Sequence, residues 1–306
     1  MDVAGENEIF PCPNLYCIIQ KRAEVIMFKL GIIGYPLGHS ISAVIQKAGL
    51  ESIGLEGSYD VMETPPEDLI SRIKYIKANG YNGFNVTIPL KVPMSLFLED
   101  IDDYANIAGC VNTVKVLEDK SFYGYNTDIY GFKKAIPQDF DLNGKNASIL
   151  GTGGASRAAV VGLAERGVKE IDFYTRNIIN SRQTLDYVRA KFPEITFNVY
   201  QIQNIRSLEH TSIIVNATPI GMKGFMADQM PLERADLDKL NPAKTIIYDI
   251  VYNPVKTILI QEAQKRGLKT IGGLDMLIYQ AERAIEIWTG QSPDTKVMKI
   301  AALEAL

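Results

Sequence analysis

Short apolar segments alternate with helical patterns from about residue 28 to the end of the chain. The apolar segments cover residues 29–33, 146–150, 170–174, 212–215 and 245–249, and they are continuous rather than alternating runs. Continuous apolar strands are typical of a parallel sheet that is covered on both faces. Helical patterns at residues 156–166 and 180–191 complete a β-α-β rhythm. The alternation therefore predicts an α/β protein.

The length and charge of the chain limit what it can do. Its 306 residues suffice for two domains of ordinary size. A formal net charge of −4 gives no sign of the basic surface that nucleic acids need. No run of about 20 apolar residues is present, as a membrane span would require. We therefore expect no nucleic-acid or membrane partner, while a small anionic ligand is compatible with the composition.

Three cysteines and two histidines are too few for a disulfide framework or a zinc site. Cys12 and Cys17 lie close in sequence without a second pair or a nearby histidine, so no metal is expected. Sparse free thiols are typical of a reducing compartment, which predicts a cytoplasmic location. Residues 1–27 lack the basic start and apolar core of a secretory signal, and we treat them as an N-terminal extension.

Two features of the second half bear on its organisation. Gly131, Pro137 and Gly144 lie within residues 128–145, just before a new strand, and predict a domain boundary there. Near the C-terminus, one apolar helical face is formed by Leu274, Leu277, Ile278, Ala281, Ile285 and Trp288. Gln280 lies at the edge of this face, from which an amide can point into a cleft; a surface glutamine is the alternative.

A glycine-rich loop follows the apolar segment 146–150. Gly151, Gly153 and Gly154 precede a helical pattern that begins near Ser156, which replaces the third glycine of a G-x-G-x-x-G fingerprint. Gly151 permits a tight turn, and Gly153 allows the backbone to approach a pyrophosphate at the positive end of the helix. The context predicts a Rossmann-type, doubly wound dinucleotide-binding domain. A glycine-rich turn that binds nothing is the alternative.

The end of the next strand indicates which dinucleotide is bound. An NAD site usually has an acidic residue there, which accepts hydrogen bonds from the ribose. This chain instead has Thr175, Arg176 and Asn177, with Arg182 further along. An arginine can pair with a 2′-phosphate and stack on the adenine, so the residues favour NADP. The alternative is that Arg176 is a plain surface residue.

Four polar clusters of the first half follow strand-like segments, where α/β active sites collect their polar groups. They lie at residues 39–42, 85–91, 111–113 and 126–128. A pocket built from them would hold hydroxyls, amides, one cation and one anion, which suits a small polyhydroxylated carboxylate. Each cluster has a structural alternative, because Ser40 and Ser42 can cap a helix and Lys91 can be a solvated surface charge.

Taken in order, these clusters resemble motifs of the shikimate dehydrogenase family. The matching segments are residues 34–40, 85–91, 109–113, 124–128, 151–157, 216–222, 248–254 and 272–277. An ordered series that extends from about Lys29 to Gly290 is far more specific than any single motif. The resemblance implies an NADP-dependent oxidoreductase that interconverts 3-dehydroshikimate and shikimate, in chorismate and aromatic amino acid biosynthesis.

The resemblance also implies two α/β domains with the active site in the cleft between them. An N-terminal substrate domain would comprise residues 28–127 together with residues 273–306, because the C-terminal helices return to it. Residues 128–272 would form the Rossmann-like NADP-binding domain. The sequence leaves the oligomeric state open, with a homodimer among the alternatives.

Each site residue has a role that the resemblance implies. Lys91 and Asp128 would form the catalytic pair. Shikimate would be held by Ser40 and Ser42 at its carboxylate and by Thr87, Asn112 and Gln280 at its hydroxyls, with Tyr252 lining the pocket. NADP would contact Gly151, Gly153, Gly154, Ala155, Ser156, Thr175, Arg176, Asn177, Thr218 and Gly273.

The protonation of Lys91 decides its chemical role. A lysine ammonium at the C3 carbonyl can stabilise negative charge on the oxygen and donate a proton. The charge of Asp128 favours the ammonium form, whereas burial favours the neutral amine. The sequence leaves open which effect is larger, and therefore whether Lys91 is the proton donor or mainly an electrostatic clamp.

A few positions depart from the family pattern. Ala43 and Ile258 replace common prolines, and Asn180 stands where a second basic residue is common. Ile129 replaces the usual glycine after the catalytic aspartate, and a β-branched residue does not readily adopt a positive φ. We therefore expect strain at Ile129.

Two other functions are compatible with these motifs. A quinate/shikimate dehydrogenase that uses NAD would share almost all of them, although Arg176 argues against NAD. A nucleotide-binding regulatory protein without catalysis is the second alternative. Retention of both Lys91 and Asp128 argues against it, because such a protein has no physical need for either residue.

Overall fold

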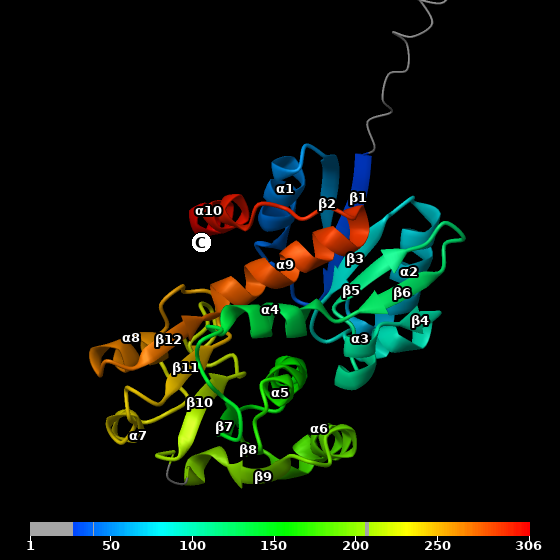
Figure 1. Ribbon diagram of the computed structural model, residues 1–306. Helices are drawn as coiled ribbons and strands as arrows, with labels where there is room; N and C mark the ends of the chain where they lie inside the picture. The colour runs from blue at the N-terminus through cyan, green and yellow to red at the C-terminus, as the bar shows by residue number, and fades with distance from the viewer. Residues whose placement is uncertain (1–26, 39, 206–207) are drawn as a thin grey trace, which may run out of the picture.

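The computed structural model describes residues 27–38, 40–205 and 208–306. Within these residues the chain forms two six-stranded sheets with flanking helices. Figure 1 shows them as two lobes, the first sheet in blue to green above and the second in green to orange below. The α/β class predicted from the sequence is confirmed.

The second sheet is the Rossmann-type sheet. All of its strand pairs are parallel, in the order β12-β11-β10-β7-β8-β9, so the chain starts at the centre and winds outward in both directions. Its strands are β7 (Asn146–Leu150), β8 (Glu170–Thr175), β9 (Thr196–Gln201), β10 (Thr211–Asn216), β11 (Ile246–Asp249) and β12 (Lys269–Gly272). The helices between them are α5 (Gly154–Glu165), α6 (Ile178–Lys191), α7 (Arg234–Asp238) and α8 (Ile258–Lys265).

The first sheet is mixed and has the order β2-β1-β3-β5-β6-β4. Its strands are β1 (Met27–Gly34), β2 (Glu56–Glu63), β3 (Gly83–Val86), β4 (Asp100–Ile101), β5 (Thr113–Val116) and β6 (Phe122–Tyr125). The central pairs β1–β2 and β1–β3 are parallel, whereas β5 runs antiparallel to both of its neighbours. This lobe also contains α1 (Ser42–Ser52), α2 (Leu69–Ala78) and α3 (Asp103–Ala108).

Two helices connect the lobes. Helix α4 (Thr127–Ala135) leads from the first sheet to the second, and α9 (Gly273–Thr289) leads back. They pack against each other between the two sheets (Figure 1). The Lys134 ammonium of α4 lies 2.8 and 2.6 Å from the two carboxylate oxygens of Glu282 on α9. The two connections thus form one helical pair.

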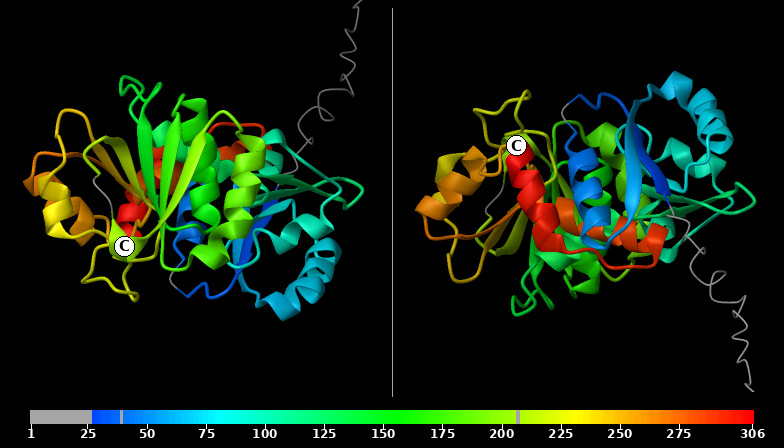
Figure 2. Two further views of the ribbon diagram at one scale, coloured as in Figure 1. Left: turned by 90° about the horizontal axis from the view of Figure 1, so that it is seen from below. Right: turned by 90° about the horizontal axis from the view of Figure 1, so that it is seen from above.

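The C-terminal helices complete the core of the first lobe. The apolar face predicted at residues 274–288 joins Leu30 and Ile45 in one buried cluster. Trp288 Nε1 donates to the carbonyl oxygen of Val114 on β5 at 2.9 Å. Figure 2 shows α10 (Thr295–Ala305), in red, beside the blue helix α1. The last helix therefore packs against the first helix of the described chain.

Ile129 is not strained, so that expectation was wrong. It lies inside α4, is fully buried, and packs with Ala108, Ala158 and Val161. Among the described non-glycine residues, positive φ angles occur only at Lys120 and Met226. A helical position requires no positive φ, and the isoleucine side chain fills space between helices of the two lobes.

Candidate active site

Lys91 and Asp128 face each other at one edge of the first sheet. Lys91 follows β3, and Asp128 lies in the first turn of α4. The Lys91 ammonium pairs with Asp128 Oδ2, and the two side chains are only 16% and 12% exposed. Burial is the largest single effect and acts to lower the pKa of Lys91, but the charge and hydrogen bond of Asp128, together with a smaller effect of Cys110, outweigh it and raise this pKa above its ordinary value. Lys91 is therefore an ammonium ion at neutral pH.

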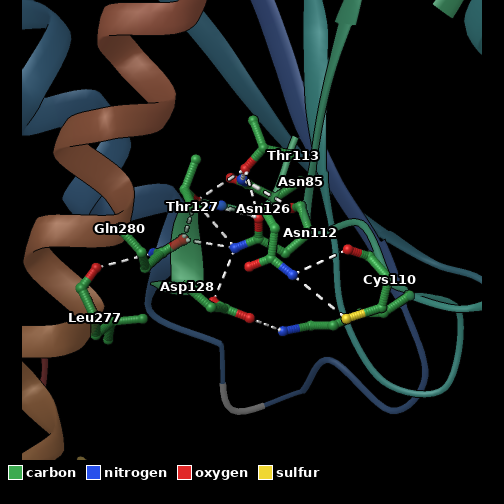
Figure 3. Close-up of polar contacts among 10 residues, drawn as sticks. Asn85, Cys110, Asn112, Thr113, Asn126, Thr127, Asp128, Leu277 and Gln280 are labelled. Carbon is green, nitrogen blue, oxygen red and sulfur yellow. Dashed lines mark hydrogen bonds and ion pairs between the residues drawn. The ribbon is translucent and has the colours of Figure 1, made fainter. Parts of the chain in front are cut away.

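Asn112 holds Asp128 from the opposite side (Figure 3). Asn112 Nδ2 donates to Asp128 Oδ1 at 2.8 Å and to Thr127 Oγ1 at 3.0 Å. The backbone N–H of Thr127 donates to Asn112 Oδ1 at 2.7 Å, which fixes the orientation of the amide. Gln280 of α9 reaches the same cluster, with its Oε1 3.4 Å from Thr127 Oγ1. Residues from three separate segments of the sequence, at positions 112, 127–128 and 280, thus meet at one point.

A second layer of polar residues supports Asn112. Asn85 Nδ2 donates to Thr113 Oγ1 at 3.0 Å and to the Asn112 carbonyl at 3.3 Å. Asn85 Oδ1 accepts from the Tyr59 hydroxyl at 2.6 Å and from Gln46 Nε2 at 3.3 Å. The sequence singled out the motif that contains Asn85, but Tyr59 and Gln46 carry no local signal. In the sequence alone, nothing distinguishes Tyr59 from other strand residues or Gln46 from other helix residues.

The other expected substrate residues follow the carboxyl ends of strands. Ser40 Oγ lies 3.1 Å from Ser42 Oγ, and the N-cap of α1 is Ile41, so neither serine occupies the capping position. Thr87 follows β3 and Tyr252 follows β11. All four side chains are partly buried, whereas His39, which precedes Ser40, lies outside the described residues.

The glycine-rich loop between β7 and α5 fits a pyrophosphate. Gly151 has a φ of +101°, a conformation that favours glycine. A Cβ added at Gly153 would meet no atom within 4 Å, so the space beside the loop is open. The N-cap of α5 is Gly153, with no side-chain cap, and the first N–H groups of a helix have no partner within it. Ser156 Oγ instead donates to the Gly153 carbonyl at 2.5 Å.

The loop lies beside the Lys91–Asp128 pair. A Cβ added at Gly154 would be 3.8 Å from Lys91 Cδ, although the two residues belong to different lobes. Ala155 is the next residue of the helix. Thr218 follows β10, the strand next to β7, and its Cγ2 would be 3.0 Å from a Cβ at Gly151. This is the point where the strand order reverses, which is where doubly wound sheets bind ligands.

The residues expected to select NADP follow β8. Arg176 is exposed, and Asn177 donates its backbone N–H to Thr175 Oγ1 at 3.3 Å. Thr184 Oγ1 of α6 donates to the Thr152 carbonyl at 3.3 Å, which ties this segment to the glycine-rich loop. An exposed guanidinium at this position fits a 2′-phosphate.

Gly273 has a packing constraint that the sequence did not reveal. A Cβ at this position would lie 2.0 Å from the Ile250 carbonyl oxygen. The first residue of α9 therefore has to be glycine for the helix to approach the segment after β11.

Neither a metal cluster nor a membrane helix occurs in the described part of the chain. Within residues 27–38, 40–205 and 208–306, no group of three His, Cys, Asp or Glu side chains could hold a metal ion. In the same residues, none of the helices combines the length and apolar character that crossing a bilayer requires.

Comparisons with known proteins identify the family. The substrate binding domain of shikimate dehydrogenase matches residues 32–114, and the C-terminal domain of shikimate 5'-dehydrogenase matches residues 273–303. A shikimate dehydrogenase (NADP(+)) of Archaeoglobus fulgidus is 39% identical over 280 residues, which cover 92% of this chain and 99% of the relative. The chain belongs to the shikimate dehydrogenase family.

Solved structures agree with this membership of the shikimate dehydrogenase family. A shikimate 5-dehydrogenase of Thermus thermophilus, solved in complex with NADP(H) and shikimate, is 33% identical and has a TM-score of 0.78. The match covers 92% of this chain and 100% of the Thermus chain. A 5-ketofructose reductase of Gluconobacter sp. strain CHM43 is 30% identical and has a TM-score of 0.82, and the match covers 92% of this chain and 99% of the reductase. Similar folds thus occur in a protein named for a different ketone.

Proposed function

We propose that the chain is an NADP-dependent shikimate dehydrogenase, which reversibly reduces 3-dehydroshikimate to shikimate. The observation that carries the proposal is the buried Lys91–Asp128 pair beside the glycine-rich loop. It combines a fixed ammonium with an open helix N-terminus, and a Cβ at Gly154 would be 3.8 Å from Lys91 Cδ. The curated relatives that carry this name support the same activity.

The assignment of substrate contacts is part of the proposal. Ser40 and Ser42 provide two adjacent hydroxyls that can donate to the carboxylate of shikimate. The ring hydroxyls are assigned to Thr87, Asn112 and Gln280, with Tyr252 closing the pocket. The mutual hydrogen bonds of Asn112, Thr127 and Gln280 support this assignment, because they preorganise the amide groups before substrate binds.

The mechanism follows from the charge of Lys91. Bound NADPH supplies the hydride that adds to the C3 carbonyl carbon. As negative charge builds on the carbonyl oxygen, the Lys91 ammonium stabilises it and then donates a proton, which leaves a hydroxyl and a neutral amine. Asp128 keeps the amine in position, and the raised pKa of Lys91 favours its reprotonation from solvent. In the reverse direction the neutral amine accepts the hydroxyl proton.

The cofactor site is assigned to the Rossmann-type sheet. The backbone of residues 151–156 holds the pyrophosphate, and Arg176 with Thr175 and Asn177 holds the 2′-phosphate. Thr218 and Gly273 border the same edge of the sheet. The open space at Gly153 and the exposure of Arg176 support this assignment.

The domain division belongs to the same proposal. Residues 28–127 and 273–306 form the substrate domain, residues 128–272 form the NADP domain, and residues 1–27 are an extension. The packing of α9 and α10 on α1 supports the discontinuous domain. A cytoplasmic location is proposed from the cysteine content.

A homodimer is also compatible with the sequence, and sedimentation velocity would distinguish it from a monomer.

Steady-state kinetics test the function directly. We would measure oxidation of shikimate and of quinate, each with NADP and with NAD, and reduction of 5-ketofructose with NADPH. Turnover mainly with shikimate and NADP is the expected result. Turnover mainly with quinate and NAD would instead make the chain a quinate dehydrogenase. Folded protein that binds NADP but turns over none of these substrates would favour a regulatory role.

A further inference from the structure

A buried chain of hydrogen bonds leads from β2 to the catalytic pair, and its outer end is Tyr59. The Tyr59 hydroxyl donates to Asn85 Oδ1 at 2.6 Å, and Asn85 Nδ2 donates to Thr113 Oγ1 at 3.0 Å. Thr113 Oγ1 lies 3.1 Å from Thr127 Oγ1. Thr127 in turn bonds Asn112, whose Nδ2 holds Asp128. Asn85, Asn112, Thr113 and Thr127 are at most 6% exposed.

The orientation of the Asn85 amide decides the direction of this chain. Asn85 faces the Asn112 carbonyl at 3.3 Å, so its Nδ2 has to point there; the reverse orientation would place two carbonyl oxygens together. Its Oδ1 then needs donors on the other side. Tyr59 is the closer one at 2.6 Å, and Gln46 Nε2 is the weaker one at 3.3 Å.

The direction of the Thr113 hydroxyl hydrogen depends on that orientation. The Thr113 hydroxyl accepts from Asn85, so its single hydrogen is directed toward Thr127 or Asn112. Asn112 Oδ1 accepts the Thr127 backbone N–H at 2.7 Å, which leaves Asn112 Nδ2 for Asp128. If Asn85 reversed, the Thr113 hydrogen would turn away from Asn112, and buried acceptors would lose their donors.

We propose that Tyr59 is a positioning residue of the active site, whose hydroxyl stabilises the orientation of the Asn85 amide and thereby the Thr113 hydrogen bond that supports Asn112, the residue that holds Asp128 against Lys91. The proposal rests on the shikimate dehydrogenase activity inferred above. Burial raises the pKa of Tyr59, so its hydroxyl remains a donor over the working range of the enzyme.

Tyr59→Phe removes the donor and retains the ring. We expect kcat/KM for shikimate to fall about threefold to tenfold, the range that corresponds to one hydrogen bond. The KM for NADP should not change, because the glycine-rich loop has no part in the network. Tyr81→Phe is the matched control, since its hydroxyl donates to Asp60 Oδ2 at 2.6 Å outside the network and its ring is also buried.

A second variant changes the Asn85 amide, to which Tyr59 donates. Asn85→Asp keeps the size and the acceptor but cannot donate to Thr113 when ionised, so kcat/KM should fall more than about tenfold. Wild-type kcat/KM in Tyr59→Phe, or equal losses in Tyr59→Phe and Tyr81→Phe, would overturn the proposal.

A double-mutant cycle tests the network without substrate. Unfolding equilibria are measured for Tyr59→Phe, Asp128→Asn and the double variant. The proposal expects non-additivity of more than about threefold in the unfolding equilibrium constant, whereas unconnected sites are additive within about twofold. Additive effects would overturn it. A wild-type enzyme that turned over no shikimate would contradict the proposed function alone, because the cycle would still decide the role of Tyr59.

Discussion

The proposed active site contains one buried cation, Lys91, which is assigned to the reacting oxygen. Lys91 is held by a carboxylate whose second oxygen accepts from Asn112, so both partners of the ion pair have fixed directions. A buried lysine with no such partner would lose its proton more readily. In the proposed mechanism, Asp128 therefore acts through the charge of Lys91 as much as through any contact of its own.

Replacing Lys91 should abolish most of the activity and leave cofactor binding intact. Lys91→Ala is expected to lower kcat by about a hundredfold to ten-thousandfold, because the stabilising charge and the proton donor are lost together. The dissociation constant of NADP, measured by fluorescence titration, should stay near the wild-type value. Lys47→Ala is the control, since that side chain is 69% exposed. Near-normal kcat in Lys91→Ala would refute the mechanism.

Asp249 is a second buried carboxyl, at the end of β11. It is fully buried and accepts from Thr257 Oγ1 at 2.6 Å and from the Val251 N–H at 3.0 Å. Burial, which exceeds the opposing effect of these bonds, raises the pKa of Asp249 from 3.8 to about 6. The folded state therefore binds this proton more tightly than the unfolded chain does.

The raised pKa of Asp249 predicts how stability changes with pH. Its contribution to the free energy of unfolding is fully present below pH 3.8 and is lost as pH rises through about 6. The loss is about 3 kcal/mol for a shift of this size. Asp249→Asn should lack this change, which urea unfolding at a series of pH values can measure. Parallel pH profiles for the variant and the wild type would contradict the assignment.

Local sequence signals predicted the residues to which the chemistry is assigned, but not the residues behind them that orient their side chains. Lys91, Asn112 and Asp128 each belong to a short polar motif after a strand, so they were predictable. Tyr59 and Gln46 become visible only when β2 and α1 are folded beside β3. The predicted strain at Ile129 was wrong for a related reason, because the sequence pattern alone did not show that this position lies within a helix.

At the scale of elements, the start of α9 lies very close to the segment that follows β11. The Gly273 position leaves no room for a methyl group, because the Ile250 carbonyl oxygen would lie 2.0 Å from it. The neighbouring Gly272 has a φ of −92°, and a Cβ there would be 3.5 Å from the Val255 carbonyl, an ordinary contact.

These two glycines make a matched pair of variants. Gly273→Ala should destabilise the protein by about 1–3 kcal/mol or more, because α9 has to move away from the segment after β11. Gly272→Ala should cost less than about 1 kcal/mol. Thermal unfolding measures both effects. Equal stability of the two variants would show that the contact relaxes easily.

Hydrophobic pattern predicted five of the twelve strands that the described residues form. Four of the five predicted strands belong to the parallel sheet, where covering helices demand uninterrupted apolar runs. The mixed first sheet was harder, because its short strands β4, β5 and β6 bury fewer residues and carry less signal. Its strand order depends on contacts between distant segments, which no local pattern encodes.

At the scale of the molecule, the two lobes meet through Arg157. This residue lies in the first turn of α5 and is 8% exposed. Its Nη1 donates across the lobes to the Ala108 carbonyl at 3.1 Å, and its guanidinium lies 5.0 Å from the ring centroid of Tyr187. The Ala108 carbonyl is at the end of α3, where helix carbonyls lack internal partners and cations are favoured.

Removal of Arg157 should therefore weaken the junction between the lobes. Arg157→Met is expected to lower the free energy of unfolding by about 1–3 kcal/mol, because a buried carbonyl loses its donor. Arg189→Met is the control: its Nη2 donates to the Phe197 carbonyl at 3.0 Å within one lobe, on an exposed side chain. Denaturant unfolding compares them, and equal losses would exclude a special role for the junction.

The return of α9 and α10 to the first lobe also has a consequence for synthesis. A ribosome delivers β1 to β6 first, yet Leu30 and Ile45 gain their partners on these helices only after residue 273 has emerged. The Rossmann-type sheet is one unbroken stretch and can close in the meantime. The lobe that carries Lys91 is thus begun first and finished last, so translation has to be nearly complete before the nascent chain can assemble the proposed catalytic centre.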